Sequence, residues 1–445
     1  MSKIKEALAA ASETRVLQIG PGLLSTVASL FLEQFPGKKA VIIADDITYR
    51  IAGESVHQHL NAAGITQLSP FVYTDPELYA EYQYVEQLIA FLSTHDAIPI
   101  AVGSGTINDL TKLASHLTDR PYMCVATAAS MDGYTAFGAS ITVNGAKQTI
   151  NCPAPQACLA DIDIICKAPI GMTASGYADL FAKITSGADW ILADSLDVEP
   201  IDKKAWDIVQ GGLHDALADP EGVKAGDATA LTKLTEGLML GGFAMQWAKS
   251  SRPASGAEHQ FSHLWNMENH LNNGEHISHG FQVSIGTIAI SALYEVFLKT
   301  KVDELDIAQS ISQWPLPEQA EEAALKIFEG TDFSEIGLQE TKAKYINSAA
   351  LEVQLGLLKQ NWPVIKDRLA AQVLPYVEAK RRLDLVGAPT TPEQIGISRK
   401  RLRETFIRAQ FIRRRFTILD VSVRTGYLNQ WLDELFGKGG IWEIT

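Results

Sequence analysis

The sequence predicts an α/β protein in which an open, mostly parallel sheet is followed by a helical domain. In residues 1–168, short apolar runs that suit fully buried strands alternate with segments of helical period. In residues 169–445 the apolar runs give way to long amphipathic segments. The chain has 445 residues, more than one hydrophobic core usually serves, so we expect two domains.

In the first domain, the apolar runs predict the strands of a sheet, and the order of strands and helices predicts whether neighbouring strands run parallel. The runs are 16–19, 40–44, 98–102, 122–126 and 158–165. Helical period appears at 23–35, 82–92 and 107–116. Because strands alternate with helices along the chain, neighbouring strands should run parallel.

The second domain is predicted to be all-helical. Amphipathic segments cover 174–193, 230–249, 279–298, 318–328 and 343–358. Pro169 and Gly171 interrupt regular structure, so we place the boundary between residues 168 and 169.

Composition and charge restrict the classes of function. The formal net charge of -14 repels polyanions, so we expect no nucleic acid and no anionic membrane as partner. We find no run of the ~18–20 apolar residues that a membrane span needs. The four cysteines lack CxxC spacing, which indicates a reduced, cytoplasmic protein.

Two polar turns follow neighbouring predicted strands. The first opens a helix with small residues, where backbone N–H groups and the helix dipole attract a pyrophosphate, although an ordinary tight turn would look the same. The second also lies at a strand's carboxyl end, where open α/β sheets bind ligands. An ordinary turn is possible at each position, but two adjacent strand ends of this kind, at 103–107 and 127–134, favour a ligand site.

An acidic pair, Asp45-Asp46, ends the predicted strand 40–44. A carboxylate there accepts hydrogen bonds from the adenosine ribose and repels a 2′-phosphate. We assign this role to Asp45, which favours NAD(H) and leaves NADP(H) as the alternative. An equally simple interpretation makes Asp46 the N-cap of the next helix.

Histidines gather in a short segment, which indicates a metal site. Five of the ten, His259, His263, His270, His276 and His279, fall within 21 residues. His259 and His263 are four residues apart and share a helix face, as paired ligands do. Glu258 precedes His259, so the HExxH protease motif is absent. Asp179 on an apolar helix is our candidate oxygen ligand; the alternative is a helix-surface aspartate paired with Lys183.

These segments together resemble the iron-containing alcohol dehydrogenase and dehydroquinate synthase superfamily, most closely its sn-glycerol-1-phosphate dehydrogenase branch. The similarity rests on segments that occur in the family's order: 103–112, 130–134, 176–179, 255–259, 279–280 and 412–420. The resemblance implies a Rossmann-like domain followed by a helical metal-binding domain. It also implies one divalent metal, zinc, iron or nickel, on Asp179, His259 and His279. The nucleotide cofactor that it implies contacts two turns, with the residues Gly103, Ser104, Gly105, Thr106, Ile107, Thr127, Ala128, Ala129 and Ser130. Asp132 and His263 are then the catalytic residues, and both contact the substrate together with Asp179.

The implied reaction is hydride transfer from NAD(P)H to dihydroxyacetone phosphate. Three alternatives remain at this stage: a sugar-phosphate cyclase of the dehydroquinate synthase type, a polyol dehydrogenase, and a silent nucleotide or metal sensor. The chain departs from the branch at Ala136, where a serine is usual. We expect the substrate phosphate near Lys147 or Lys183, and a homo-oligomeric assembly.

A basic segment, residues 399–415, has arginines interleaved with apolar residues at helical spacing. We interpret it as a helix with a solvated or ion-paired basic face; otherwise it binds an anion or another subunit.

Overall fold

The computed structural model describes residues 3–143 and 146–444. The chain forms two compact units. Unit 1 comprises Met1–Leu180, Lys204–Ser251 and Leu385–Ala388, and unit 2 comprises Phe181–Lys203, Arg252–Asp384 and Pro389–Thr445. The main sheet ends before residue 168, and the chain passes between the units several times after it. A single domain boundary after residue 168 stays a prediction.

The main sheet of unit 1 has six strands, all parallel, in the order β1-β8-β5-β4-β2-β3. The strands are β1 (Val16–Gly20), β2 (Ala40–Asp45), β3 (Phe71–Tyr73), β4 (Ile98–Gly103), β5 (Met123–Ala126) and β8 (Ala157–Asp161). This confirms the predicted fold class. The short β3 was not predicted, because three residues are too few to show a pattern.

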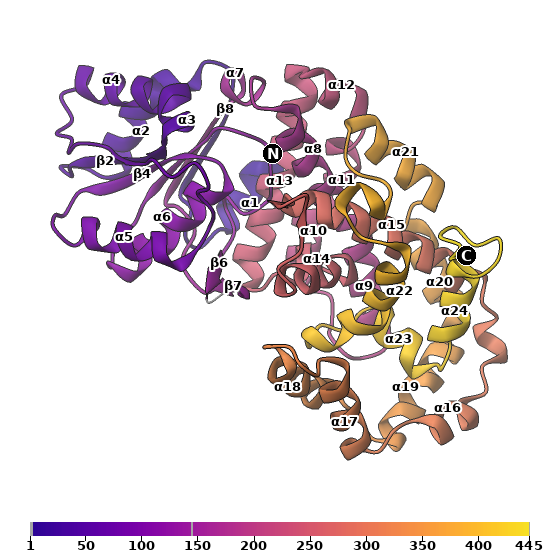
Figure 1. The fold of residues 1–445 in the computed structure, drawn as a ribbon. Helices are drawn as coiled ribbons and strands as arrows, with labels where there is room; N and C mark the ends of the chain where they lie inside the picture. The colour runs from indigo at the N-terminus through magenta and orange to yellow at the C-terminus, as the bar shows by residue number, and fades with distance from the viewer. Residues whose placement is uncertain (1–2, 144–145, 445) are drawn as a thin grey trace. The chain divides into compact units, whose positions relative to one another are not determined.

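Helices cover both faces of this sheet (Figure 1). On one face, alternate strand residues such as Ile42, Ile100 and Val125 join a core with α2 (Val27–Gln34) and α4 (Glu54–Ala62). On the other face lie α5 (Tyr82–Leu92) and α6 (Gly105–Leu117). Burial on both faces explains the continuous apolar runs in the sequence.

One local expectation in unit 1 was wrong. The run 158–165 is strand only to Asp161, whose carboxylate caps the short helix α7 (Ile162–Ile165). The segment 23–35 is helical as predicted, with a 3₁₀ turn, η1 (Leu23–Thr26), that leads directly into α2. An antiparallel hairpin, β6 (Ala139–Val143) with β7 (Ala146–Ile150), follows β5.

A second, small hydrophobic core lies among the remaining helices of unit 1. In this core Ile208, Val209, Leu240 and Phe243 pack with Ala7 of the N-terminal helix. The helices are α1 (Lys3–Ala10), α3 (Asp46–Thr48), η2 (Tyr49–Gly53), α8 (Ile170–Phe181), α10 (Lys203–Gln210), α11 (Leu213–Ala216), α12 (Pro220–Ala225) and α13 (Ala228–Ala248).

Unit 2 is helical, as predicted, apart from a hairpin of two-residue strands, β9 (Leu271–Asn272) and β10 (Glu275–His276). The predicted helix 343–358 is interrupted at Asn347, whose side chain caps α19. Its helices are α9 (Lys183–Ser195), η3 (Arg252–Ala254), α14 (Ala257–Met267), α15 (His279–Lys299), η4 (Val302–Glu304), α16 (Ile307–Gln313), α17 (Pro317–Ile327), α18 (Ser334–Lys344), α19 (Ser348–Gln360), α20 (Trp362–Gln372), α21 (Tyr376–Val386), η5 (Pro392–Ile395), α22 (Arg399–Arg408), η6 (Ala409–Ile412), α23 (Ile418–Arg424) and α24 (Leu428–Phe436).

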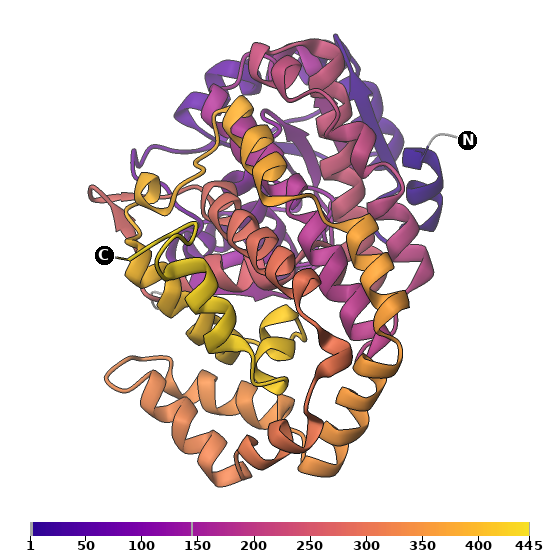
Figure 2. The same ribbon diagram turned by 90° about the vertical axis from the view of Figure 1, so that its right-hand side faces the viewer.

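Helix α15 is the central helix of unit 2 (Figure 2). Among the described residues it is the one helix long and apolar enough to cross a membrane, but 83% of its apolar window is buried inside the protein. Such burial is what a core helix requires.

Candidate functional site

The two polar turns predicted at the sheet edge lie side by side. The backbone N–H of Thr127, at the end of β5, donates to the carbonyl of Gly103, at the end of β4 (3.1 Å). A Cβ at position 103 would lie 2.6 Å from the Cβ of Ile107, so only glycine allows this tight strand-to-helix turn. Helix α6 then begins at Gly105, and its first N–H groups have no acceptor within the helix. The turns can therefore receive an anionic group.

Asp45 ends β2 and caps the helix that follows. Its Oδ1 accepts from the N–H groups of Ile47 (2.9 Å) and Thr48 (2.8 Å). The N-cap is thus Asp45 and not Asp46, because the helix begins one residue earlier than an Asp46 cap would require. A cap role and a ribose contact are compatible, since a carboxylate has two oxygens.

Buried Lys112 fixes the loop that follows the second turn. It projects from α6, and its Nζ donates to the carbonyls of Gly133 (2.8 Å), Ala136 (3.0 Å) and Gly138 (3.0 Å). Asp109 lies 3.7 Å from the same ammonium. Position 136 contributes its backbone carbonyl to this contact, so alanine in place of serine leaves the contact intact.

Asp179 is positioned by an unusually close approach of α8 to the Thr127–Ser130 turn. A Cβ at Gly176 would lie 2.0 Å from the carbonyl oxygen of Ala129, so glycine is required. Three residues later, Oδ2 of Asp179 accepts from the backbone N–H of Asp132 (3.0 Å). Asp179 and Lys183 are both fully buried, so the interpretation of Asp179 as a helix-surface residue was wrong.

In unit 2, three of the clustered histidines gather around the start of α14. The ring of His259 lies 5.2 Å from that of His279 and 6.4 Å from that of His263, centroid to centroid. Helix α15 brings His279 to this place because it packs closely on α14: a Cβ at Gly286 would lie 2.5 Å from the carbonyl oxygen of Glu258.

Oxygen atoms orient two of these rings. Nδ1 of His259 lies 2.7 Å from Oε1 of Glu258, and Nδ1 of His279 lies 3.3 Å from Oγ of Ser262. Both contacts use Nδ1, so the Nε2 edges point elsewhere, which is how metal-binding histidines are usually held. Burial acts to raise the pKa of Glu258, but hydrogen bonds led by that of His259 outweigh it and lower the pKa.

The other two clustered histidines have different surroundings. His270 is structural, because its Nε2 contacts the carbonyl of Ile395 and its Nδ1 contacts Arg401, both at 2.7 Å. His276 is exposed on β10. Sequence spacing grouped all five histidines. It could not show that His270 and His276 lie apart from the other three, because this depends on where the β9–β10 hairpin turns the chain.

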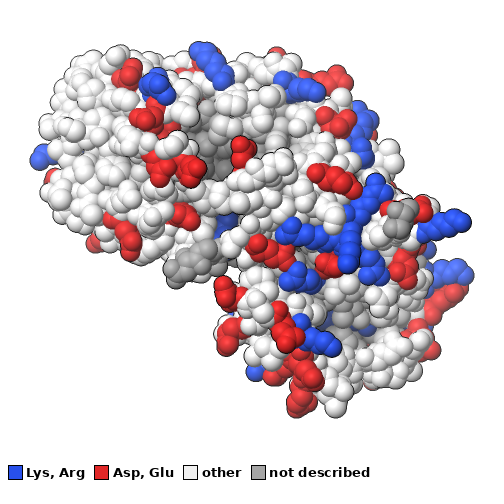
Figure 3. All heavy atoms as spheres, viewed as in Figure 1, with Lys and Arg blue, Asp and Glu red and all other residues white. Residues whose placement is uncertain are grey.

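Most of the basic segment is ion-paired, as predicted. On α22, Arg399, Arg401, Arg403 and Arg408 pair with carboxylates of Glu393, Glu268 and Asp433. Figure 3 shows basic side chains gathered over the region of α22, with acidic groups beside them. Arg413 differs: its Nη1 lies 3.1 Å from Nε2 of His263.

Lys147 and Lys183, the two lysines expected near the substrate phosphate, have different surroundings. Nζ of Lys147 lies 5.8 Å from the ring centroid of Tyr79. Lys183 is fully buried at the start of α9.

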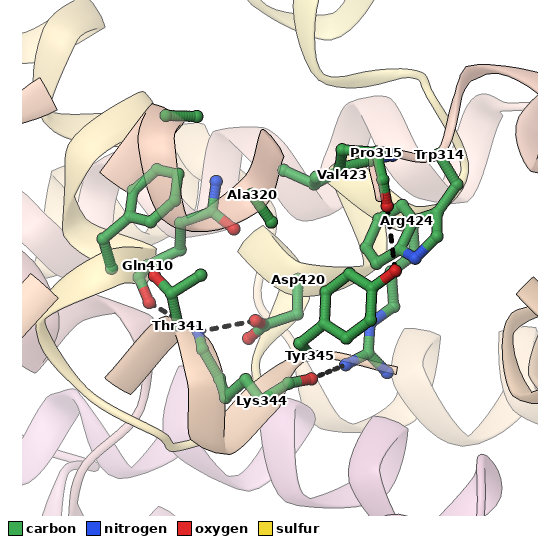
Figure 4. Close-up of a pocket in the computed structure, with 12 residues that line it drawn as sticks. Trp314, Pro315, Ala320, Thr341, Lys344, Tyr345, Gln410, Asp420, Val423 and Arg424 are labelled. Carbon is green, nitrogen blue, oxygen red and sulfur yellow. Dashed lines mark hydrogen bonds and ion pairs between the residues drawn. The ribbon is translucent and has the colours of Figure 1, made fainter. Parts of the chain in front are cut away.

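A cavity of about 120 Å³ lies elsewhere in unit 2, lined by α17, α18, η6 and α23 (Figure 4). Its walls are mostly apolar. The ammonium of Lys344 is held by Asp420 (2.6 Å) and by the carbonyl of Gln410, whose distance is also short (2.5 Å). None of the site residues expected from the sequence lines this cavity.

Comparison with known proteins identifies the family. The iron-containing alcohol dehydrogenase family matches residues 18–169. A glycerol-1-phosphate dehydrogenase [NAD(P)+] of Halalkalibacterium halodurans is 34% identical over 59% of this chain and 66% of its own length, so the chain spans slightly less than two thirds of that relative. One of Geobacillus stearothermophilus is 30% identical over 86% of both chains.

Solved structures support the fold alone. A probable glycerol dehydrogenase of Sinorhizobium meliloti superposes with a TM-score of 0.59 over 94% of this chain and 96% of its own, at 14% identity. On the strength of the sequence relatives, the chain belongs to the glycerol-1-phosphate dehydrogenase branch of the iron-containing alcohol dehydrogenase family.

Proposed function

We propose that this protein reduces dihydroxyacetone phosphate to sn-glycerol 1-phosphate with NAD(P)H, at one divalent metal ion. The observation that carries the proposal is the pair of imidazoles, His259 and His279, each oriented through Nδ1 by a neighbouring oxygen. Relatives that bear the name glycerol-1-phosphate dehydrogenase support the choice of substrate.

The donor set fits a metal. Asp179, His259 and His279 would hold the ion with one carboxylate and two imidazoles. This combination suits zinc, iron and nickel, so the metal's identity stays open to measurement. When bound, such a metal supplies a positive charge that polarises a ketone oxygen.

The chain's own residues have distinct proposed roles. The turns at Gly103–Ile107 and Thr127–Ser130 hold the cofactor's pyrophosphate through backbone N–H groups. Asp132 contacts the substrate, and His263 relays the proton. The guanidinium of Arg413 has only donors, so Nε2 of His263 accepts from it in this arrangement. Nδ1 then carries the ring's N–H, the donor that the reduction of a ketone requires.

Asp45 makes NAD(H) our preferred cofactor over NADP(H). Its carboxylate at the end of β2 would accept from a ribose hydroxyl and would repel a 2′-phosphate. A D45N variant that gains activity with NADPH relative to NADH would support this role, and an unchanged ratio would argue against it.

The test of the reaction follows NADH absorbance with metal-reconstituted protein. The substrates are dihydroxyacetone phosphate, dihydroxyacetone and none, each with a chelated control. We expect oxidation with the phosphorylated ketone that chelation abolishes. A faster reaction with dihydroxyacetone would indicate a polyol dehydrogenase instead. Turnover of a sugar phosphate without net NADH change would indicate a cyclase, and cofactor binding with no turnover a silent sensor.

The cellular compartment, partners and oligomeric state of the protein are proposals as well. All four cysteines are free thiols, which suits a reducing, cytoplasmic compartment. We expect no nucleic-acid partner at a net charge of -14. Assembly into a homo-oligomer is a prediction that analytical ultracentrifugation would test.

A further inference from the structure

Helix α9 carries a carboxylate, Asp189, that is fully buried where several helices of unit 2 meet. Its Oδ2 accepts from the backbone N–H of Ala257, the first residue of α14 (2.8 Å). Its Oδ1 accepts from the hydroxyl of Tyr294 on α15 (2.6 Å) and from the N–H of Ile418, the first residue of α23 (2.9 Å). One side chain therefore joins α9 to three other helices, among them the helix that carries His259.

A second contact links α9 to α14 through Glu258. Oε2 of Glu258 accepts from the hydroxyl of Thr185 (2.9 Å), which lies one helical turn before Asp189. Its Oε1 accepts from the N–H of Gly256 (2.7 Å) and lies 2.7 Å from Nδ1 of His259. Helix α9 thus reaches the His259 ring in two ways, through the carboxylate that orients the ring and through the first turn of α14.

The two carboxylates, Asp189 and Glu258, meet beside Gly256. A Cβ at position 256 would lie 2.5 Å from Oδ2 of Asp189 and 2.9 Å from Oε2 of Glu258, so glycine is required there. Burial, and then the charge of Glu258, raise the pKa of Asp189 to about 7. The charges of Arg252 and Arg415 attract Glu258, so they offset the repulsion between the carboxylates only in part.

Capping of α14 alone does not require this arrangement. A serine, threonine or asparagine side chain can accept from the first N–H groups of a helix, and it would bring no second charge to Glu258. Two like charges in a protein interior are unfavourable. A divalent cation bound to the other edge of the His259 ring would attract both carboxylates, so the pair suits a role in metal binding.

We propose that Asp189 is a positioning residue for the metal ligand His259. Together with Thr185 it fixes Glu258 and the first turn of α14, so that the ring keeps one orientation. The inference rests on the proposed function for the role of His259 as a ligand. Hydrogen-bond partners behind a ligating histidine hold its ring and increase its basicity, and a group that holds such a partner acts on the metal in the same way.

The experiment compares D189N and T185V with Y294F in the full-length protein. Asparagine keeps the size of Asp189 but has one acceptor oxygen, so the N–H of Ala257 or of Ile418 loses its partner. Valine keeps the shape of Thr185 without its hydroxyl. Y294F is the matched control, because it removes a hydrogen bond from the other oxygen of the same carboxylate and leaves the contact with α14 in place.

Each protein is loaded with Co²⁺, whose visible absorption reports the geometry of its ligands, and metal affinity is measured by chelator competition. We expect affinity to fall about 10-fold in D189N and T185V, the lower end of the range for outer partners, with an altered cobalt spectrum. Y294F should keep the affinity and spectrum of wild type, although its urea midpoint falls because Asp189 loses a hydrogen bond.

A purely structural role predicts a different result. If D189N and Y294F lower metal affinity in proportion to their loss of stability, with the cobalt spectrum unchanged, Asp189 only supports the fold and the proposal is wrong. Wild-type affinity and spectrum in D189N would overturn it as well. Should D189N fail to fold, T185V decides, because wild-type metal binding in that variant contradicts a role for α9.

The protonation of the His259 ring separates this inference from the reaction. In metal-free protein with isotopically labelled histidine, NMR shows which ring nitrogen carries the proton. We expect Nδ1–H in wild type and Y294F, because Glu258 accepts there, and partial loss of that tautomer in D189N.

The proposed function and the inference can therefore fail separately. If wild type binds cobalt but does not oxidise NADH with dihydroxyacetone phosphate, the proposed function is wrong, and the metal affinities of the variants still decide the role of Asp189. If wild type binds no metal, the proposed function also fails, and the tautomer decides: an unchanged tautomer in D189N would then overturn the inference.

Discussion

Gly176 faces Ala129 so closely that a Cβ at position 176 would lie 2.0 Å from the Ala129 carbonyl oxygen. The contact joins α8 to the turn after β5, and Asp179 follows one helical turn later. In G176A the backbones must separate, and the hydrogen bond between Asp132 and Asp179 should weaken. We expect unfolding free energy to fall by about 1–3 kcal/mol and metal affinity to drop with it. Urea unfolding and chelator competition would measure both.

Gly356 provides the control for this substitution. It lies within α19, and nothing stands within 4 Å of a Cβ built there. G356A should therefore raise stability by about 0.5–1 kcal/mol, because alanine is the better helix former. A G176A protein as stable as G356A, with unchanged metal affinity, would show that α8 can move without consequence for Asp179.

Glu258 orients His259, so its loss should affect metal binding more than folding. In E258Q a neutral amide replaces the carboxylate that lies 2.7 Å from Nδ1. We expect metal affinity to fall about 10- to 100-fold, the range found when such outer partners are changed. Chelator competition would give the affinity. E268Q removes a carboxylate at the C-cap of α14, where it pairs with Arg401, and should leave metal affinity near that of wild type.

The sequence predicts the parts of this protein that depend on local pattern. The parallel strands are visible as continuous apolar runs and many of the helices by their helical period, and each motif that carries the family resemblance is contiguous. The buried role of Lys112 was not predictable, because its three carbonyl partners come from a loop 21–26 residues away. Likewise, the contact of Asp189 with the N–H of Ala257 joins two helices across 68 residues, and no local pattern connects them.

Removing Lys112 should destabilise unit 1 strongly. K112M leaves the carbonyl groups it satisfied without a donor and leaves Asp109 without its nearby cation. We expect a loss of about 3–5 kcal/mol in unfolding free energy by urea titration. K366M, at an exposed position on α20, should change stability by less than about 0.5 kcal/mol.

The double variant D109N/K112M tests the reason for that loss. Burial raises the pKa of Asp109, against which the charge of Lys112 acts. If an uncompensated buried charge is part of the cost, replacing Asp109 by asparagine should recover some of the stability lost in K112M. Additive losses would instead assign the whole effect to the carbonyl contacts.

Glu378 should make the stability of unit 2 depend measurably on pH in the acid range. Hydrogen bonds from Arg381 and then Arg382 lower the pKa of its carboxyl group from 4.5 to about 2. A carboxyl group whose pKa is lower in the folded state stabilises the protein above its unfolded pKa. That contribution is lost as the pH falls from about 4.5 to 2. Because 30% of the side chain is exposed, we expect at most about 1 kcal/mol. Urea unfolding of wild type and E378Q should therefore differ at pH 7 and converge toward pH 3. E352Q, which removes an exposed carboxylate from α19, is the control, and a difference between wild type and E378Q that is the same at both pH values would contradict the assignment.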